Sequence, residues 1–210
     1  MRKVICGKSL FEIYLERLKR LARNDAFAGA GIGLSRDDRE MWDIAQKAGV
    51  NVLERSPESV SGIPPLSAVF SFIEPIDAEF FMWINGCHPF LRDGTILLAA
   101  YRFTSDESLR SLTTVTKKTT HYWDWQGIPV LAPPGYRTDS AGFLYEATHA
   151  FHIWSKKEML ENARPWGQTS AKDPHLFVIT DPYENLDADT EDELEILAAV
   201  GEHRWNSAIV

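Results

Sequence analysis

The stretch AGAGIGLSRDDREMWDIAQKAGVNVL, residues 28–53, decides the fold class because it predicts a strand, a helix and a second strand in succession. Residues 28–34 are small and apolar, as in a tightly packed strand. Gly49 is placed to end the helix, and residues 50–53 suit a short strand. The helix is indicated by apolar residues at helical spacing: Met41, Ile44, Ala45 and Ala48. This alternation of strand and helix predicts an α/β fold.

The flanking sequence extends the same alternation over one domain, residues 1–210. Ser9 and Glu12 form a capping box that opens a helix, and Thr190 and Glu193 form another. The apolar run 80–84 predicts a strand buried on both faces, as in a parallel sheet. The remaining expected elements are a helix over 96–103, strands over 111–116, 141–145 and 176–179, and a hairpin over 123–130.

Composition excludes several classes of protein. The chain has 210 residues, 44% hydrophobic and 25% charged, which is typical of a globular protein. Its formal net charge of −8 argues against a nucleic-acid partner, because phosphate backbones attract basic surfaces. No apolar run is long enough to cross a membrane. Two isolated cysteines, Cys6 and Cys87, indicate no disulfide framework, so a cytoplasmic location is expected.

Two carboxylates near the end of the chain form a candidate metal site. Asp187 and Asp189 are two residues apart and would share one face of an extended backbone. Mg²⁺ binds through one or two carboxylates together with substrate phosphates. The simpler interpretation is an acidic helix start favoured by the helix dipole, and spacing alone favours that interpretation.

Three other sequence patterns give weaker evidence for a functional site. Gly29, Gly31 and Gly33 lack the spacing of a dinucleotide-binding loop, so tight strand packing explains them better. His149 and His152 could hold zinc, but the usual ligand pattern is missing, and surface or core histidines are the better interpretation. The side chains of Cys87 and His88 would point to opposite sides of an extended backbone, which disfavours a catalytic cysteine activated by the neighbouring histidine.

The order of short segments resembles the cytidylyltransferases that make CMP-activated acidic sugars. The likeness is greatest to the acylneuraminate (sialic acid) branch and smaller to the 3-deoxy-manno-octulosonate branch. No single motif is strong, and the shared order and spacing carry the resemblance. The segments that match are 5–10, 33–37, 52–56, 83–91, 137–141 and 186–192.

The resemblance implies a GT-A-like α/β fold, with a mostly parallel central sheet flanked by helices and a small β-hairpin region that forms a homodimer. It implies that an acidic sugar attacks the α-phosphate of CTP and releases pyrophosphate, with Mg²⁺ as cofactor. The implied metal ligands are Asp187 and Asp189. The implied nucleotide-binding residues are Arg2, Lys3, Ser35 and Arg55, and the implied substrate-binding residues are Asn85, His88, Arg137 and Asp139.

Several positions depart from the family pattern. The family has a strand and a phosphate-binding loop before the segment that begins here at Ile5, and Met1 falls just beyond that loop. Pro64 and Pro65 stand where the family binds nucleotide, and Asp139 stands for an asparagine. Without the first strand, one strand edge in the sheet is expected to lack a partner, with low stability or self-association as the consequence.

These departures leave three hypotheses: an active CMP-sugar synthetase, a non-catalytic relative that binds a sugar, a nucleotide or a partner protein, and a divergent nucleotidyltransferase for another substrate.

Overall fold

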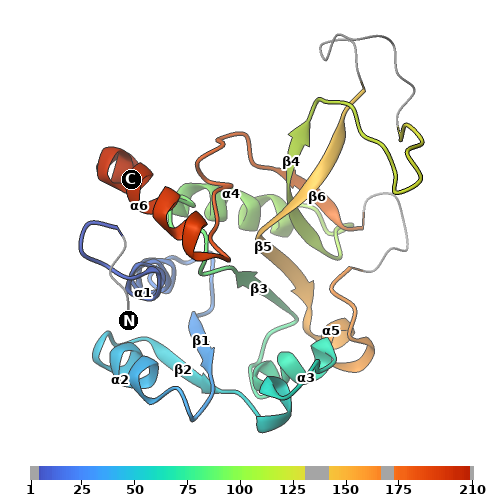
Figure 1. The fold of residues 1–210 in the computed structure, drawn as a ribbon. Coiled ribbons are helices and arrows are strands. Elements are labelled where there is room, and N and C mark those ends of the chain that lie inside the picture. The colour runs from blue at the N-terminus through green and yellow to red at the C-terminus, as the bar shows by residue number, and fades with distance from the viewer. Residues whose placement is uncertain (1–4, 131–141, 167–172, 209–210) are drawn as a thin grey trace.

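The computed structural model describes residues 5–130, 142–166 and 173–208, and side chains up to residue 203. Helices and strands alternate along these residues, as the sequence predicts (Figure 1). The helical elements are α1 (Leu10–Leu21), α2 (Arg39–Lys47), η1 (Pro57–Val60), α3 (Leu66–Val69), η2 (Ser71–Ile73), α4 (Asp93–Thr104), α5 (Lys156–Asn162) and α6 (Glu191–Ala208). The strands are β1 (Gly31–Leu34), β2 (Asn51–Glu54), β3 (Phe80–Ile84), β4 (Leu112–Lys118), β5 (Leu144–Ser155) and β6 (His175–Val178).

Local sequence signals explain the front of the chain. The Ser9 side chain accepts a hydrogen bond from the Glu12 backbone, and the Glu12 carboxylate accepts one from the Ser9 backbone, so the predicted capping box starts α1. Gly49 follows α2 with φ +71°, which a glycine adopts without strain. The parallel pair β1–β2 flanks α2, and the predicted strand–helix–strand unit is confirmed.

The larger sheet has the strand order β3-β5-β4-β6. β5 is antiparallel to β3 and to β4, whereas β4 and β6 are parallel, so β5 alone runs against the other three strands. The larger sheet is therefore mixed, with two antiparallel pairings and one parallel pairing, and the β1–β2 pair is parallel. The prediction that residues 80–84 form a strand buried on both faces is wrong: β3 is an edge strand, and most of its residues are only half-buried.

The two sheets remain separate because β1 and β3 do not pair. The Asn85 N–H donates to the carbonyl of Ala150 on β5, so the N–H and C=O groups of Met82 and Ile84 point away from β5. The Tyr14 hydroxyl donates to the Ile84 carbonyl on that outer side, at 3.1 Å. The expected unpaired edge is thus confirmed for the part of the chain that the structure describes.

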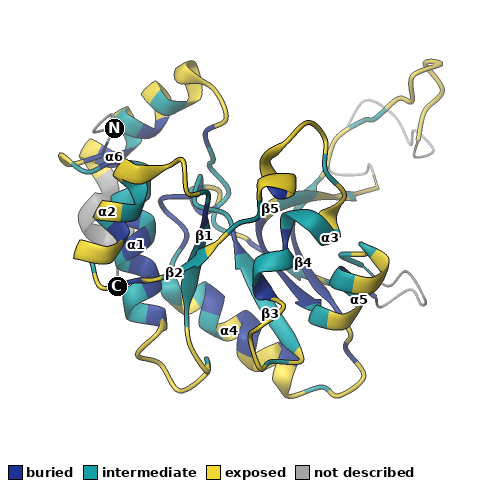
Figure 2. Cartoon of the chain, turned by 90° about the horizontal axis from the view of Figure 1, so that it is seen from below, coloured by how far each residue is buried: buried dark blue, intermediate teal, exposed yellow. Residues whose placement is uncertain are grey.

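The core lies between the larger sheet and the helices α1 and α4 (Figure 2). A second apolar cluster joins α1 to α6, and a third joins α1 to the β1–β2 unit. Gly33 packs so closely against Phe72 that an added Cβ would come within 2.8 Å of the ring. A Cβ added at Gly31 would likewise lie 3.0 Å from the Asn51 carbonyl oxygen, so the packing interpretation is confirmed for Gly31 and Gly33, whereas Gly29 has open space around it. No described helix combines the length and the apolar character needed to cross a membrane.

Candidate functional site

The loop that follows β3 forms the floor of the candidate site. Asn85, at the end of the strand, accepts a hydrogen bond from the Cys87 N–H through its side-chain oxygen, at 3.0 Å. This turn directs residues 87–91 back toward α1. In open α/β sheets, ligands bind beyond the carboxyl ends of the strands, near the point where the chain switches direction across the sheet. The loop after β3 occupies such a place, beside the break between the two sheets.

A buried arginine supports this loop from below. Arg17 donates to the carbonyls of His88 and Pro89 at 3.1 and 3.0 Å, and to the carbonyl of Leu91 at 2.7 Å. Burial lowers the pKa of Arg17 to about 10, and nearby Asp93 opposes this change. Arg17 therefore stays cationic at neutral pH. A buried cation that binds three carbonyls gives the loop a fixed shape.

His88 links this loop to the acidic segment before α6. Its side chain is completely buried, with Nδ1 3.3 Å from the Glu184 carbonyl and Nε2 3.9 Å from a carboxylate oxygen of Asp187. Burial lowers the pKa of His88, and the charge of Asp187 opposes that change. The side chain that the resemblance assigns to the substrate thus lies inside the protein, next to a predicted metal ligand.

Asp187 and Asp189 lie over the same loop. Ala188 between them is buried, Asp187 is half-buried and Asp189 is exposed. Desolvation raises the pKa of the Cys87 thiol, and the charges of Asp189 and Asp187 raise it further. Both carboxylates therefore act on one point beside the end of β3. They precede α6, which begins at Glu191. The Glu193 carboxylate accepts from the Thr190 backbone and hydroxyl, and the Thr190 hydroxyl accepts from the Glu193 backbone, which confirms the second capping box.

A charged pair that the sequence did not predict fixes the acidic segment to α4. Glu184, which is 3% exposed, accepts from the Arg92 backbone at 2.9 Å and from its guanidinium at 2.6 Å. Asp181 accepts from the same guanidinium at 3.1 Å. Two guanidinium nitrogens of Arg92 donate to one oxygen of Glu184, and the Arg92 backbone donates to the other oxygen; hydrogen bonds of this kind to a charged group are stronger than neutral ones. It fixes residues 181–187 against the start of α4.

Ser35 and Arg55 lie on the other sheet. The Ser35 carbonyl accepts from the Trp42 indole at 2.7 Å, and the Arg55 guanidinium donates to the Ser59 carbonyl at 2.8 Å. The buried Nε of Arg55 has no hydrogen-bond partner. Within the described residues, no hydrogen bond or ion pair joins Ser35 or Arg55 to the first group, which is Asn85, His88, Asp187 and Asp189.

Four expected site residues lie outside the described residues: Arg2, Lys3, Arg137 and Asp139. The structure therefore brings together Asn85, His88, Asp187 and Asp189, and it places Ser35 and Arg55 in a second group.

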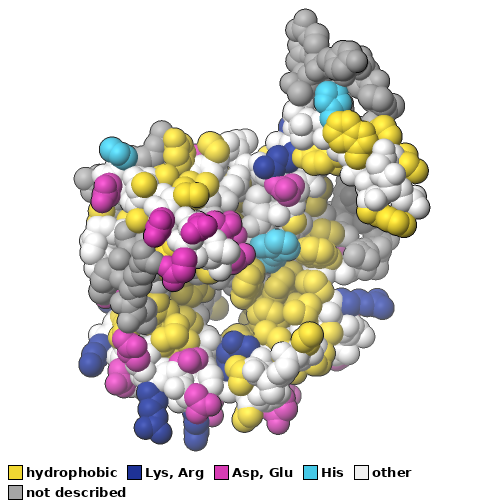
Figure 3. All heavy atoms as spheres, viewed as in Figure 1, with side chains coloured by type: hydrophobic (Ala, Val, Ile, Leu, Met, Phe, Trp, Pro, Cys, Tyr) yellow, Lys and Arg dark blue, Asp and Glu magenta, His cyan; other side chains and the backbone are white. Residues whose placement is uncertain are grey.

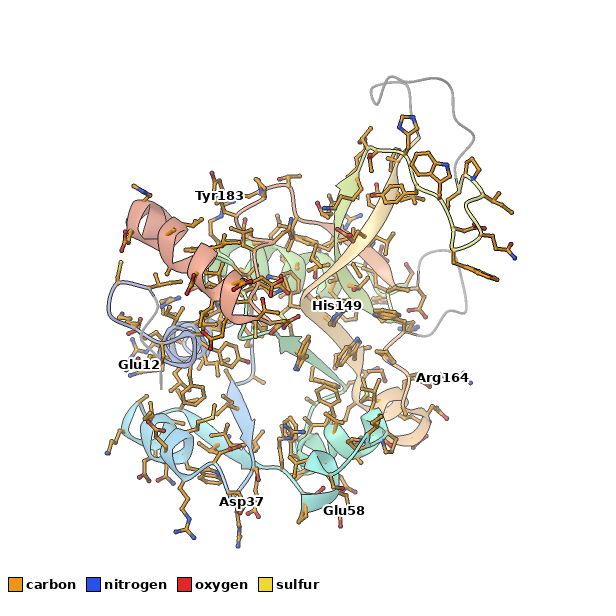
Figure 4. All side chains as sticks on the ribbon, in the orientation of Figure 1. Glu12, Asp37, Glu58, His149, Arg164 and Tyr183 are labelled. Carbon is orange, nitrogen blue, oxygen red and sulfur yellow. The ribbon has the colours of Figure 1, made fainter. Side chains whose placement is uncertain are left out.

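The surface view shows how the two groups are arranged. Acidic side chains gather beside the centre of this face, with a histidine next to them and a broad apolar surface below it (Figure 3). That histidine occupies the place where Figure 4 labels His149, whereas Asp37 and Glu58, which follow β1 and β2, lie at the far end of the molecule. The face thus combines carboxylates, a histidine and apolar walls.

The metal-binding capacity of the protein alone is limited. Within the described residues, no group of three or more histidine, cysteine, aspartate or glutamate side chains could hold a metal ion. The zinc interpretation of His149 and His152 therefore gains no support. The aspartate pair suits Mg²⁺ only when a ligand supplies further oxygen atoms, as nucleotide phosphates do.

Comparisons with known proteins place the fold. No family model matches the sequence, and no curated protein shows significant similarity. The chain is similar to the structure of 4-diphosphocytidyl-2C-methyl-D-erythritol synthase from Anaerococcus prevotii, with 19% identity, a TM-score of 0.63, and coverage of 95% of this chain and 91% of that one.

A second similar structure is CMP:2-keto-3-deoxy-manno-octonic acid synthetase complexed with CTP. Its identity to this chain is 11%, its TM-score is 0.51, and the match covers 96% of this chain and 77% of that one. The chain therefore has the α/β nucleotidyltransferase-like fold of these two cytidylyltransferases, and the predicted fold class is confirmed.

Proposed function

We propose that the chain is a cytidylyltransferase that transfers CMP from CTP to the hydroxyl of an acidic sugar, such as an N-acylneuraminate, and releases pyrophosphate. The observation that carries the proposal is the Asp187–Asp189 pair, set over the end of β3 in a fold shared with two cytidylyltransferases. One of those two structures, that of CMP:2-keto-3-deoxy-manno-octonic acid synthetase, is complexed with CTP.

The aspartate pair fits Mg²⁺ by its chemistry. Two hard oxygen donors act on one point, and the described residues offer no complete cage, so phosphate oxygens and water would complete the coordination. When bound, Mg²⁺ would neutralise the triphosphate and the charge that develops at the leaving pyrophosphate. The chain contributes a fixed position for Asp187, through its contact with buried His88.

The remaining roles follow from the resemblance and the two groups of residues. Arg55, Ser35, Arg2 and Lys3 would bind the nucleotide. Asn85 would hydrogen-bond the sugar, His88 would act near it through Asp187, and Asp139 would lie beside it. Arg137 would bind the sugar carboxylate as a two-pronged donor. A reaction that depends on aligning the sugar hydroxyl with the α-phosphate and on neutralising the phosphate charge needs no covalent intermediate.

Pyrophosphate release tests this function directly. Purified protein with CTP and Mg²⁺ should release pyrophosphate when an N-acylneuraminate or another acidic sugar is added, and should not do so with the matching neutral sugar. A matched pair of variants, Asp187→Asn and Asp192→Asn, separates the metal site from general charge effects. Release that is equal in both variants, or absent with every acidic sugar, would contradict the proposal.

One observation favours the non-catalytic alternative. The nucleotide group on β1–β2 is separated from the larger sheet, and Arg55 already donates to its own neighbouring segment. A protein of this kind would bind CTP or the sugar without turnover. Calorimetry with each ligand alone, set beside the pyrophosphate measurement, distinguishes binding from catalysis.

A further inference from the structure

His149 lies on an irregular part of β5, beside the candidate site. Between the pairs Thr113–His152 and Val115–Ala147, β4 has one residue, Thr114, whereas β5 has the four residues 148–151. The backbone of His149 has φ +53°, a conformation that residues with side chains rarely adopt. Strained backbone of this kind concentrates at functional sites. The irregular backbone therefore makes His149 a candidate functional residue.

Thr114 maintains this backbone conformation. Its buried hydroxyl accepts from the N–H groups of Ala150 and Phe151, at 3.1 and 3.3 Å, and donates to the Phe151 carbonyl at 3.2 Å. These bonds replace the ladder bonds that the bulge removes. The bulge is thus fully supported from β4, and it leaves His149 exposed at the surface.

His149 is connected to the interior through a chain of hydrogen bonds. Its Nδ1 lies 3.2 Å from Nε2 of His152, and Nδ1 of His152 lies 2.9 Å from the Thr113 hydroxyl. The His152 ring lies nearly parallel to two neighbouring indoles, with centroids 5.6 Å from Trp83 and 5.0 Å from Trp154, and these two indoles are 6.0 Å from each other. Desolvation by burial, together with the nearby His149, lowers the pKa of His152 to about 3. His152 therefore stays neutral at physiological pH.

This neutrality limits the possible proton positions. If Nδ1–H of His152 donates to Thr113, then Nε2 of His152 is an acceptor, and His149 must donate through its own Nδ1–H. In that arrangement Nε2 of His149 carries a lone pair at the surface. In a serine protease a buried carboxylate, which can only accept, orients the histidine in a comparable way, whereas here the partner is a threonine hydroxyl that can accept or donate.

His149 is also close to the residues of the candidate site. The Ala150 carbonyl, next in the chain, accepts from Asn85 at 2.9 Å, and the Thr148 backbone on the other side interacts with His88. His149 thus lies between the residue expected to bind the sugar and the residue that contacts Asp187. Figure 4 shows its side chain at the centre of the molecule, where β5 passes the end of β3.

We propose that His149 is the general base that takes the proton from the acceptor hydroxyl, with His152 and Thr113 as positioning residues that fix its tautomer. This inference rests on the proposed cytidylyl transfer. The hydroxyl proton passes to Nε2 of His149, the oxygen lone pair forms the bond to the α-phosphorus, and the bond from that phosphorus to the bridging oxygen breaks. Pyrophosphate leaves with those electrons, and the histidinium releases its proton to solvent.

His149→Gly tests the catalytic part. Glycine suits φ +53°, so this variant should fold at least as stably as the wild type, while pyrophosphate release should fall about 100-fold or more. Added imidazole should restore activity about tenfold in this variant and leave the wild type unchanged. Ala163→Gly, at φ +51° after α5, is the matched control for backbone effects, and its activity should stay at the wild-type level.

Nitrogen NMR of the histidine rings tests the positioning part without turnover. His149 should show a protonated Nδ1 and an unprotonated Nε2, and Thr113→Val should reverse this tautomer by removing the acceptor for His152. The opposite tautomer in the wild type would overturn the inference, as would a folded His149→Gly variant with full activity or without imidazole rescue. Failure of the wild type to release pyrophosphate would instead contradict the proposed function on which the inference rests.

Discussion

The two halves of the candidate site differ in how their side chains are supported. On the larger sheet, buried groups that are distant in sequence brace the site: Arg17 supports the loop after β3, Glu184 pairs with Arg92, and His88 contacts Asp187. On the β1–β2 sheet, the Ser35 carbonyl accepts from Trp42, and the Arg55 side chain donates to Ser59, both within the same stretch of chain. The difference teaches that the half proposed to hold the metal and the acceptor is braced by distant buried groups, whereas the half proposed to bind nucleotide depends on local side-chain contacts.

The largest expected effect comes from removing the brace under the loop. Arg17→Met would leave three buried carbonyls without a donor, so the free energy of unfolding should fall by about 3 kcal/mol. Urea denaturation measures the change. Arg20→Met is the matched control, because its ion pair with Asp93 is partly exposed and should contribute less than about 1 kcal/mol. Equal losses in the two variants would show that the loop is not held by the buried cation.

Acidification should weaken the same half of the molecule. The pKa of His152 is about 3 in the folded protein and near 6.5 when unfolded, so below pH 6.5 the unfolded chain binds more protons. Stability is then present above the unfolded pKa and is lost as the pH falls, by about 2 kcal/mol between pH 6.5 and pH 5. Urea titrations at several pH values measure this slope. His152→Phe, which keeps a flat ring beside the indoles of Trp83 and Trp154, should flatten this slope, and an unchanged slope would assign the effect to other groups.

A smaller effect is expected on the other sheet. Arg55→Met removes one hydrogen bond to the Ser59 carbonyl, so the free energy of unfolding should change by no more than about 1 kcal/mol. If Arg55 binds nucleotide, the KM for CTP should rise while kcat changes little. Arg36→Met, which removes an exposed pair with Glu54, serves as the control. A loss of stability as large as that of Arg17→Met would remove the contrast between the two halves.

The open edge gives the most local prediction. The amides of Met82 and Ile84 point away from β5, whereas those of Phe81 and Trp83 point toward it. Hydrogen exchange should therefore be faster at residues 82 and 84 than at residues 81 and 83. Equal protection at all four amides in a monomeric sample would mean that another segment covers this edge, and equal protection only at high concentration would indicate self-association.

Local signals in the sequence predicted much of this fold. The two capping boxes, the helical spacing of α2 and the apolar run of β3 depend on neighbours within a few residues, and each element lies where it was expected. Of the strand expected over 141–145, residue 141 lies outside the described residues, and only Leu144 and Tyr145 belong to β5, which continues to Ser155. Its bulge depends on Thr114 from another strand, so no local pattern indicates it.

The contacts that support the candidate site could not be predicted from neighbouring residues either. Arg17 binds carbonyls more than 70 positions away, and Glu184 pairs with an arginine 92 positions away. Asp187 and Asp189 were singled out by the resemblance, because their spacing alone favoured an acidic helix start. His149 and His152 were set aside because the usual zinc-ligand pattern is missing, and sequence alone cannot show that one is exposed and the other buried. A pair of histidines three residues apart on a strand is the one signal that pointed to them.

Calorimetry of CTP binding tests the central claim most directly. Wild-type protein should bind CTP in the presence of Mg²⁺, and the double variant Asp187→Asn, Asp189→Asn should lose the Mg²⁺-dependent part of the affinity while remaining folded. Asp192→Asn, in the first turn of α6, should bind as the wild type does. CTP binding of equal strength with and without Mg²⁺, and in the double variant, would contradict a metal site at these two carboxylates.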